Sequence, residues 1–190
     1  MMLRKLFLIY KKFLCSPEDF ARYLSVKIGV NCHISVNCHF SSEPYLISIG
    51  NHVQITDDVR IFTHGGSWVL REKQPDFDCF GKVTIGNNVY IGNCVMIMPG
   101  VSVGNNVLIG TGSVVTKSIP DNSIVGGNPA RVIGDICEYS KNMQRFNLDI
   151  KRLKWGVKKM VLIALPEAKF IRKELMKPIS ITEPRNKHSH

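Results

Sequence analysis

The chain has 190 residues, with 25 Lys and Arg against 15 Asp and Glu, so its formal net charge is +10. This length fits one domain with appendages, and a hydrophobic fraction of 44% excludes a chain that is disordered throughout. No run approaches the roughly 20 apolar residues that span a bilayer, and the first apolar stretch is too short for a secretory signal. We therefore expect a cytoplasmic globular protein whose six cysteines form no disulfides.

The charge is distributed unevenly along the chain. Residues 1–25 carry a net charge of +3, residues 26–134 carry none, and residues 135–190 carry +7. Fourteen of the fifteen glycines lie in the neutral middle. The sequence thus predicts a basic, partly helical amino-terminal segment over 1–25 and a separate central domain over 26–134.

The central domain repeats with a period of six. An apolar residue recurs at every sixth position, and Gly and Asn often follow it. The four rows are Ile28, Ile34 and Phe40; Ile49, Ile55 and Ile61; Ile85, Ile91 and Ile97; and Val103, Ile109 and Val115. This period fits neither a helix nor a simple strand, and it predicts short strands and turns, three to a stacked coil of 18 residues. The β-branched residue points inward, and we expect Gly and Asn to supply positive φ at the corner.

Two interruptions break the period. Nine residues separate Phe40 from Ile49, and a longer break contains a polar excursion over 65–82. Loops this long in a compact domain are usually functional or disordered. His64 stands where the excursion begins, and an imidazole, with an ordinary pKa of about 6.5, suits a general base near neutral pH. A single histidine at a turn is also compatible with a plain surface position.

Two segments carry a family resemblance. The stretch ending at His64, with its loop and residues 83–92, resembles the galactoside, maltose and xenobiotic acetyltransferase branch of the hexapeptide-repeat acyltransferases. Residues 110–120 and 126–131 are similar to the signature G-x-G-S-V-V-T-K-D-I-P followed by G-N-P-A-R, with Ser118 in place of its Asp. The same 126–131 segment is also suited simply to ending a solenoid, because Pro129 cannot continue strand pairing.

The resemblance implies a mainly β fold, a left-handed parallel β-helix, and a homotrimer with active sites between subunits. It also implies acetyl-CoA as the co-substrate, no metal, and His64 as the base that deprotonates an acceptor hydroxyl for direct attack on the thioester. The residues implied to contact coenzyme A are Tyr90, Gly112, Thr116, Lys117 and Arg131. Those implied to contact the acceptor are Asn37 and Asp57, and either Asp57 or Asp58 is a candidate to orient His64.

A repeated Cys-His pair invites a zinc interpretation. Cys32-His33 and Cys38-His39 are six residues apart. The period places both cysteines at an inward position for small residues, which favours packing in the core over metal binding.

The carboxyl-terminal flank changes to a helical pattern. Residues 135–178 form a basic segment in which apolar residues recur at spacings of three and four, and we expect residues 179–190 to be a flexible tail. This segment and the first fifteen residues fit either packing on the trimer or peripheral contact with an anionic membrane. No nucleic-acid-binding motif is present, so we expect no nucleic-acid partner.

The sequence as a whole predicts an acetyl-CoA-dependent O-acetyltransferase that acts on a sugar hydroxyl, in the biosynthesis of a bacterial surface polysaccharide such as capsule or lipopolysaccharide. Two alternatives remain open at this point. One is an N-acetyltransferase of an amino or nucleotide sugar, and the other is a β-helix scaffold without catalytic activity.

Overall fold

The computed structural model describes residues 11–12 and 14–176. The chain divides into two compact units, Met1–Asn142 and Met143–His190, which are described separately. The expectations for the first ten residues and for the tail over 179–190 lie outside the described residues. In the part of the chain that is described, no helix is both long enough and apolar enough to cross a bilayer.

A short helix caps the amino-terminal end of the solenoid. Helix α2 (Pro17–Tyr23) begins where the Ser16 hydroxyl accepts a hydrogen bond from the Asp19 amide at 3.1 Å. Its Glu18 carboxylate accepts a hydrogen bond from the Ile34 amide at 2.6 Å. The helix therefore pairs a backbone group at the exposed edge of the first coil.

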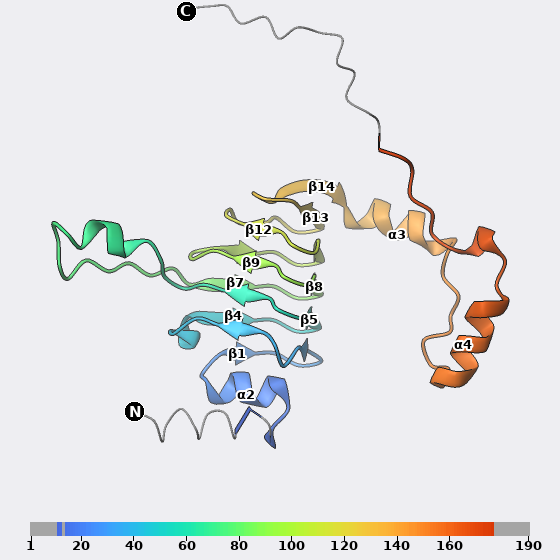
Figure 1. Cartoon of the computed structure of the whole chain (residues 1–190), viewed down its shortest axis with the longest axis horizontal. Helices are drawn as coiled ribbons and strands as arrows, with labels where there is room; N and C mark the ends of the chain where they lie inside the picture. The colour runs from blue at the N-terminus through green and yellow to red at the C-terminus, as the bar shows by residue number, and fades with distance from the viewer. Residues whose placement is uncertain (1–10, 13, 177–190) are drawn as a thin grey trace, which may run out of the picture. The chain divides into compact units, whose positions relative to one another are not determined.

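Three sheets of short, parallel strands form the faces of the first unit, and successive coils stack along them (Figure 1). The first sheet contains β1 (Lys27–Ile28), β4 (Ile47–Ile49), β7 (Val83–Ile85) and β10 (Ser102–Val103). The second contains β2 (His33–Ile34), β5 (Val53–Ile55), β8 (Val89–Ile91), β11 (Val107–Ile109), β13 (Ser123–Gly126) and β14 (Arg131–Asp135). The third contains β3 (His39–Phe40), β6 (Arg60–Ile61), β9 (Met96–Ile97) and β12 (Val114–Val115).

The strand register confirms the rows that the six-residue period predicts. In the third sheet, Ile61 pairs with Ile97, and Ile97 pairs with Val115. The inward side chains of neighbouring coils form columns of buried Ile and Val, and Ile91 and Ile97 have no exposed surface. The result is the arrangement of a parallel β-helix, in which each coil covers the apolar face of the next.

The corners differ from the prediction in one respect. Positive φ falls on the third residue after the inward one, as at Asn88 (54°) and Asn106 (56°), and not on the glycine. A Cβ built on Gly86 would lie 2.6 Å from the Gly104 carbonyl oxygen. Glycine is therefore required by the close approach of stacked corners, and Asn supplies the left-handed conformation.

The same asparagines join successive coils through their side chains. The Asn88 amide donates to Asn106 Oδ1, and the Asn106 amide donates to Asn122 Oδ1, each at 2.9 Å. His52 Nδ1 lies 2.8 Å from Asn88 Oδ1 at the lower end of this ladder. One residue type thus provides both the turn conformation and a hydrogen bond to the next coil.

Two excursions leave the solenoid after strands of the third sheet. The first follows β3 and contains the short 3-10 helix η1 (Pro44–Leu46). The second lies between β6 and β7, contains η2 (Ser67–Leu70), and projects away from the coils in Figure 1. The solenoid ends where β14 folds back and pairs antiparallel with β13, after which α3 (Ile136–Gln144) begins.

The second unit contains α4 (Trp155–Ala164) and η3 (Glu167–Lys169). Between α3 and α4 the chain is not helical, although apolar spacing predicts helix there. Asn147 and Asp149 exchange hydrogen bonds, and Asp149 has a φ of 52°. Such a turn competes with continuation of the helix.

Candidate active site

His64 lies at the base of the long excursion. It forms an isolated antiparallel bridge with Phe80, and the Gly81 amide donates to the Thr63 carbonyl oxygen at 2.7 Å. The two rings are 5.8 Å apart between centroids and tilted by 55°. The two ends of the excursion therefore meet at His64, and the Phe80 ring fixes one side of the imidazole.

A carboxylate from the preceding coil holds the imidazole. Glu43 Oε2 lies 2.7 Å from His64 Nδ1, and the same oxygen accepts a hydrogen bond from the Thr63 hydroxyl at 3.0 Å. The His64 side chain is 39% exposed, whereas that of Glu43 is 18% exposed. A carboxylate at Nδ1 requires the proton on that nitrogen, which leaves the Nε2 lone pair of the neutral ring to accept a proton.

The surroundings of Glu43 favour its ionised form. Burial raises the pKa of this carboxyl, but hydrogen bonds from Thr63, Ser42 and His64 and the charge of His64 act in the opposite direction. Together these interactions hold the pKa of Glu43 below its ordinary value. The residue is therefore an anion beside the ring across the neutral range.

The sequence missed Glu43. Asp57, which the sequence offered as a partner of His64, instead accepts a hydrogen bond from the Ser35 hydroxyl. The signal for Glu43 was the nine-residue spacing after Phe40, because the extra residues form the excursion that begins with this glutamate. The spacing showed that the corner is enlarged, but not that it turns toward His64.

The residues implied to bind coenzyme A fall into two groups. Lys117 and Arg131 line one pocket of about 170 Å³ near the end of the solenoid. Thr116 is exposed beside Lys117 and directly follows β12. Strands β6 and β12 belong to the same parallel sheet with only β9 between them. His64 and Lys117 therefore lie at the carboxyl ends of strands on one edge of the third sheet.

The remaining predicted residues lie elsewhere on the same unit. The Cys94 amide donates to the Asp57 carbonyl oxygen, and the Gly112 amide donates to that of Asn93, so these corners stack between the second and third sheets. Asn37 lies in the first of these corners along the chain, where its backbone amide donates to the Ser35 hydroxyl.

Tyr90 points outward from β8 between its register partners Gln54 and Leu108. Beside Asp57, the second sheet carries a groove of about 320 Å³ lined by residues 33–35 and 54–56. One chain thus keeps Asn37, Asp57, Gly112 and Tyr90 apart from the edge that carries His64.

The cysteines that suggested zinc pack against the core. Cys32 and Cys38 lie beside the buried cluster, and burial raises the pKa of the Cys38 thiol to about 12, partly offset by Lys12. Within residues 11–12 and 14–176, no group of three His, Cys, Asp or Glu side chains is arranged to hold a metal ion.

The comparisons with known proteins agree with this architecture. Residues 82–117 match the family model for the bacterial transferase hexapeptide with six repeats. Protein CapG of Staphylococcus aureus is 48% identical over 164 residues, which are 85% of this chain and 95% of CapG. Galactoside O-acetyltransferase of Escherichia coli K12 is 37% identical over 127 residues, which are 66% of this chain and 62% of that protein.

A solved structure resembles the chain in the same way. A hexapeptide-repeat acetyltransferase of Vibrio cholerae, crystallised with acetyl coenzyme A, superposes with a TM-score of 0.54 at 29% identity, covering 59% of this chain and 61% of the other. With the CapG match across nearly its whole length, these likenesses show that the chain belongs to the hexapeptide-repeat transferases. It is an acyltransferase of that family.

Proposed function

We propose that the protein transfers an acetyl group from acetyl-CoA to a sugar hydroxyl, in the assembly of a bacterial surface polysaccharide. The pair formed by His64 and Glu43 carries this proposal, because it leaves one imidazole nitrogen free to accept a proton. The names of the similar enzymes support it further. One is a galactoside O-acetyltransferase, and another is an acetyltransferase crystallised with acetyl coenzyme A.

In the proposed reaction, His64 Nε2 takes the proton of the acceptor hydroxyl as the oxygen attacks the thioester carbonyl carbon. The tetrahedral intermediate then collapses, the carbon–sulfur bond breaks, and the departing sulfur takes the proton back from Nε2. No acyl-enzyme forms. The Glu43 carboxylate keeps Nδ1 protonated and stabilises the cationic ring during transfer.

We assign the binding of coenzyme A to residues near the end of the solenoid. Lys117 and Arg131 share a pocket that gathers two positive charges on a domain whose net charge is zero. Such groups suit the phosphates of coenzyme A, because charge-assisted hydrogen bonds to phosphate are strong. Gly112, Thr116 and Tyr90 are the further contacts proposed for acetyl-CoA, and Asn37 and Asp57 are those proposed for the acceptor.

The site is proposed to be completed by a second copy in a homotrimer of left-handed β-helices. The support is geometric. Asn37 and Asp57 lie in a different corner of the prism from His64, so one chain alone does not present both sets to a single acceptor. A neighbouring prism placed beside the His64 edge would supply the missing corner.

The direct test is acetyl transfer by His64→Ala. Loss of a positioned general base should lower kcat by about 10² to 10⁴ while the affinity for acetyl-CoA is retained. The matched control is His39→Ala, which removes an exposed histidine from the same sheet and should leave kcat unchanged. Undiminished kcat in His64→Ala would remove the assigned base.

Two measurements separate the alternatives. Calorimetry with acetyl-CoA distinguishes an enzyme from a scaffold, since absence of binding at millimolar ligand would indicate a scaffold. A panel of paired acceptors that differ only in carrying a hydroxyl or an amino group at one carbon distinguishes O-acetylation from N-acetylation. We expect transfer to the hydroxyl acceptors.

A further inference from the structure

The second unit combines strong positive charge with exposed apolar side chains. Residues 143–176 carry nine Lys and Arg against three Asp and Glu. Several large apolar side chains of the same stretch are exposed, including Leu153, Trp155, Val157, Met160, Ile163, Phe170, Ile171, Leu175 and Met176. Neither property is needed for a helix that packs on a protein core.

Helix α4 carries both properties. Val157, Met160 and Ile163 follow one another at three-residue spacing, share a side of the helix, and are 44%, 66% and 75% exposed. Lys158 lies on the opposite side, whereas Lys159 flanks the apolar face, and its Nζ is 5.4 Å from the Trp155 ring centroid. The helix contains no acidic residue. An exposed apolar face next to lysines, without a compensating acidic group on the helix, suits contact with an anionic membrane interface.

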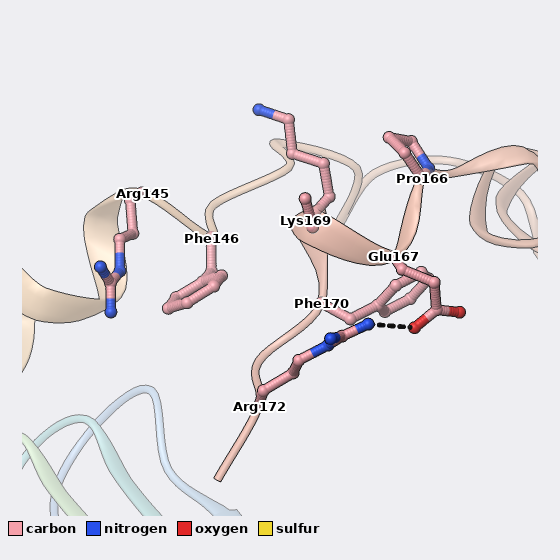
Figure 2. Close-up of a pocket in the computed structure, with 8 residues that line it drawn as sticks. Arg145, Phe146, Pro166, Glu167, Lys169, Phe170 and Arg172 are labelled. Atoms are coloured by element: carbon pink, nitrogen blue, oxygen red, sulfur yellow. Dashed lines mark hydrogen bonds and ion pairs between the residues drawn. The ribbon is translucent and has the colours of Figure 1, made fainter. Parts of the chain in front are cut away.

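Beside the helical part, the same unit forms a shallow, cationic hollow of about 800 Å³ (Figure 2). Arg145, Lys169 and Arg172 contribute positive charges, and Phe146 and Phe170 contribute apolar rings. The one acidic group, Glu167, is paired with Arg172 at 3.2 Å. An excess of two positive charges remains around the rings, which suits a phosphate group attached to an apolar chain.

We propose that residues 143–176 bind an anionic membrane surface, with the Val157, Met160 and Ile163 face in the acyl boundary and the lysines and arginines at the lipid phosphates. Charge selects this partner over a second copy of the chain. The solenoid over 26–134 has no net charge, so another copy offers no complement to these cations. Anionic headgroups offer a complement over the whole surface. This proposal does not rest on acetyl transfer.

The experiment uses the full-length protein with vesicles of phosphatidylcholine alone or with added phosphatidylglycerol. We expect flotation only with the anionic vesicles, weakened by high salt. Lys158→Gln with Lys159→Gln should reduce the partition coefficient roughly 25-fold, at about fivefold per charge. Met160→Glu with Ile163→Glu should reduce it at least as much, and both side chains are exposed enough for the fold to tolerate the change.

A matched control removes the same charge elsewhere. Lys27 and Lys141 are exposed and lie outside residues 143–176, so Lys27→Gln with Lys141→Gln should leave flotation unchanged. The chain has two tryptophans. In a Trp68→Phe background, Trp155 reports directly on the surface, and its emission should move to shorter wavelength with anionic vesicles alone.

Three outcomes would overturn the proposal. The first is no flotation with anionic vesicles. The second is an equal loss of flotation in the Lys27→Gln with Lys141→Gln control, which would mean that net charge alone accounts for vesicle binding. The third is a change of oligomeric mass in Met160→Glu with Ile163→Glu without loss of flotation, which would identify the apolar face as a contact between copies.

Discussion

At the scale of single residues, the imidazole of His64 is positioned by three neighbouring side chains. Glu43 fixes its tautomer through Nδ1, the Phe80 ring packs against it, and Ser41 Oγ lies 3.4 Å from Nδ1. Thr63, which is fully buried, donates to the same Glu43 oxygen. If His64 is the base, this orientation of its partner by a buried hydroxyl means that the imidazole loses little freedom when an acceptor binds.

Glu43→Gln tests this positioning role. The amide nearly preserves the side-chain volume but removes the negative charge that stabilises the protonated ring. We expect kcat to fall by about tenfold or more, with the KM for acetyl-CoA unchanged. Steady-state kinetics measure both constants. A rise in KM for acetyl-CoA with normal kcat would mean that Glu43 supports binding of the cofactor instead.

Acid stability tests the ionisation of the same residue. The pKa of Glu43 is lower in the folded chain, so its contribution to stability is complete above the unfolded value of about 4.3 and is lost as pH falls through the folded value. The wild type should therefore lose free energy of unfolding faster than Glu43→Gln as the pH falls below about 5. Chemical denaturation of both proteins at several pH values measures this. Parallel curves would contradict the assigned shift.

At the scale of elements, the close stacking of the corners determines where the solenoid requires glycine. A Cβ on Gly86 would meet the Gly104 carbonyl oxygen, whereas one on Gly65 meets nothing within 4 Å. Gly86→Ala should lower the free energy of unfolding by about 1–3 kcal/mol through overpacking against backbone. Gly65→Ala, the matched control, should change it by less than about 0.5 kcal/mol. Equal denaturation midpoints for the two variants would argue against tight contact at the corner.

The sequence predicted the strands better than the corners. Inward Ile and Val residues fix the register, because a slip of one residue would expose a whole column. The corner conformation depends on which of three polar positions turns, and Gly and Asn both tolerate positive φ. The sequence pattern therefore assigned positive φ to the Gly and Asn at the first two positions after the inward residue, whereas the structure has it at the third position, on Asn88 and Asn106.

The candidate site likewise contains residues that the sequence could predict and residues that it could not. His64 could be proposed from its place before the long excursion. Glu43 could not, because its contact joins two enlarged corners whose paths no period describes. The grouping of Lys117 with Arg131 was accessible only through family resemblance, since the fold-back of β14 after β13 brings them to one pocket.

At the scale of the whole molecule, the separation of the predicted residues has a consequence for assembly. Asp57 and His64 lie at opposite ends of the β6 strand, on two corners of one prism. If each site takes His64 from one copy and Asp57 from another, a variant that lacks one of these side chains can be complemented by a variant that lacks the other. If both residues act within one chain, no such complementation is possible.

Mixed assemblies test that arrangement. His64→Ala and Asp57→Ala should each be impaired alone, and co-expression should restore part of the activity in mixed oligomers, because some interfaces receive both native side chains. Activity is measured on the co-purified mixture against each variant alone. No recovery in an oligomer shown to contain both chains would place the two residues in one subunit's site.

The enlarged corner after β3 shows how a solenoid accommodates extra residues. Its extra residues leave the register of β3 with β6 undisturbed, yet they deliver the carboxylate that contacts His64. In a solenoid, a corner can change length without disturbing the columns inside. The residue that contacts His64, the proposed base, can therefore be changed by a small insertion at this corner without altering the core.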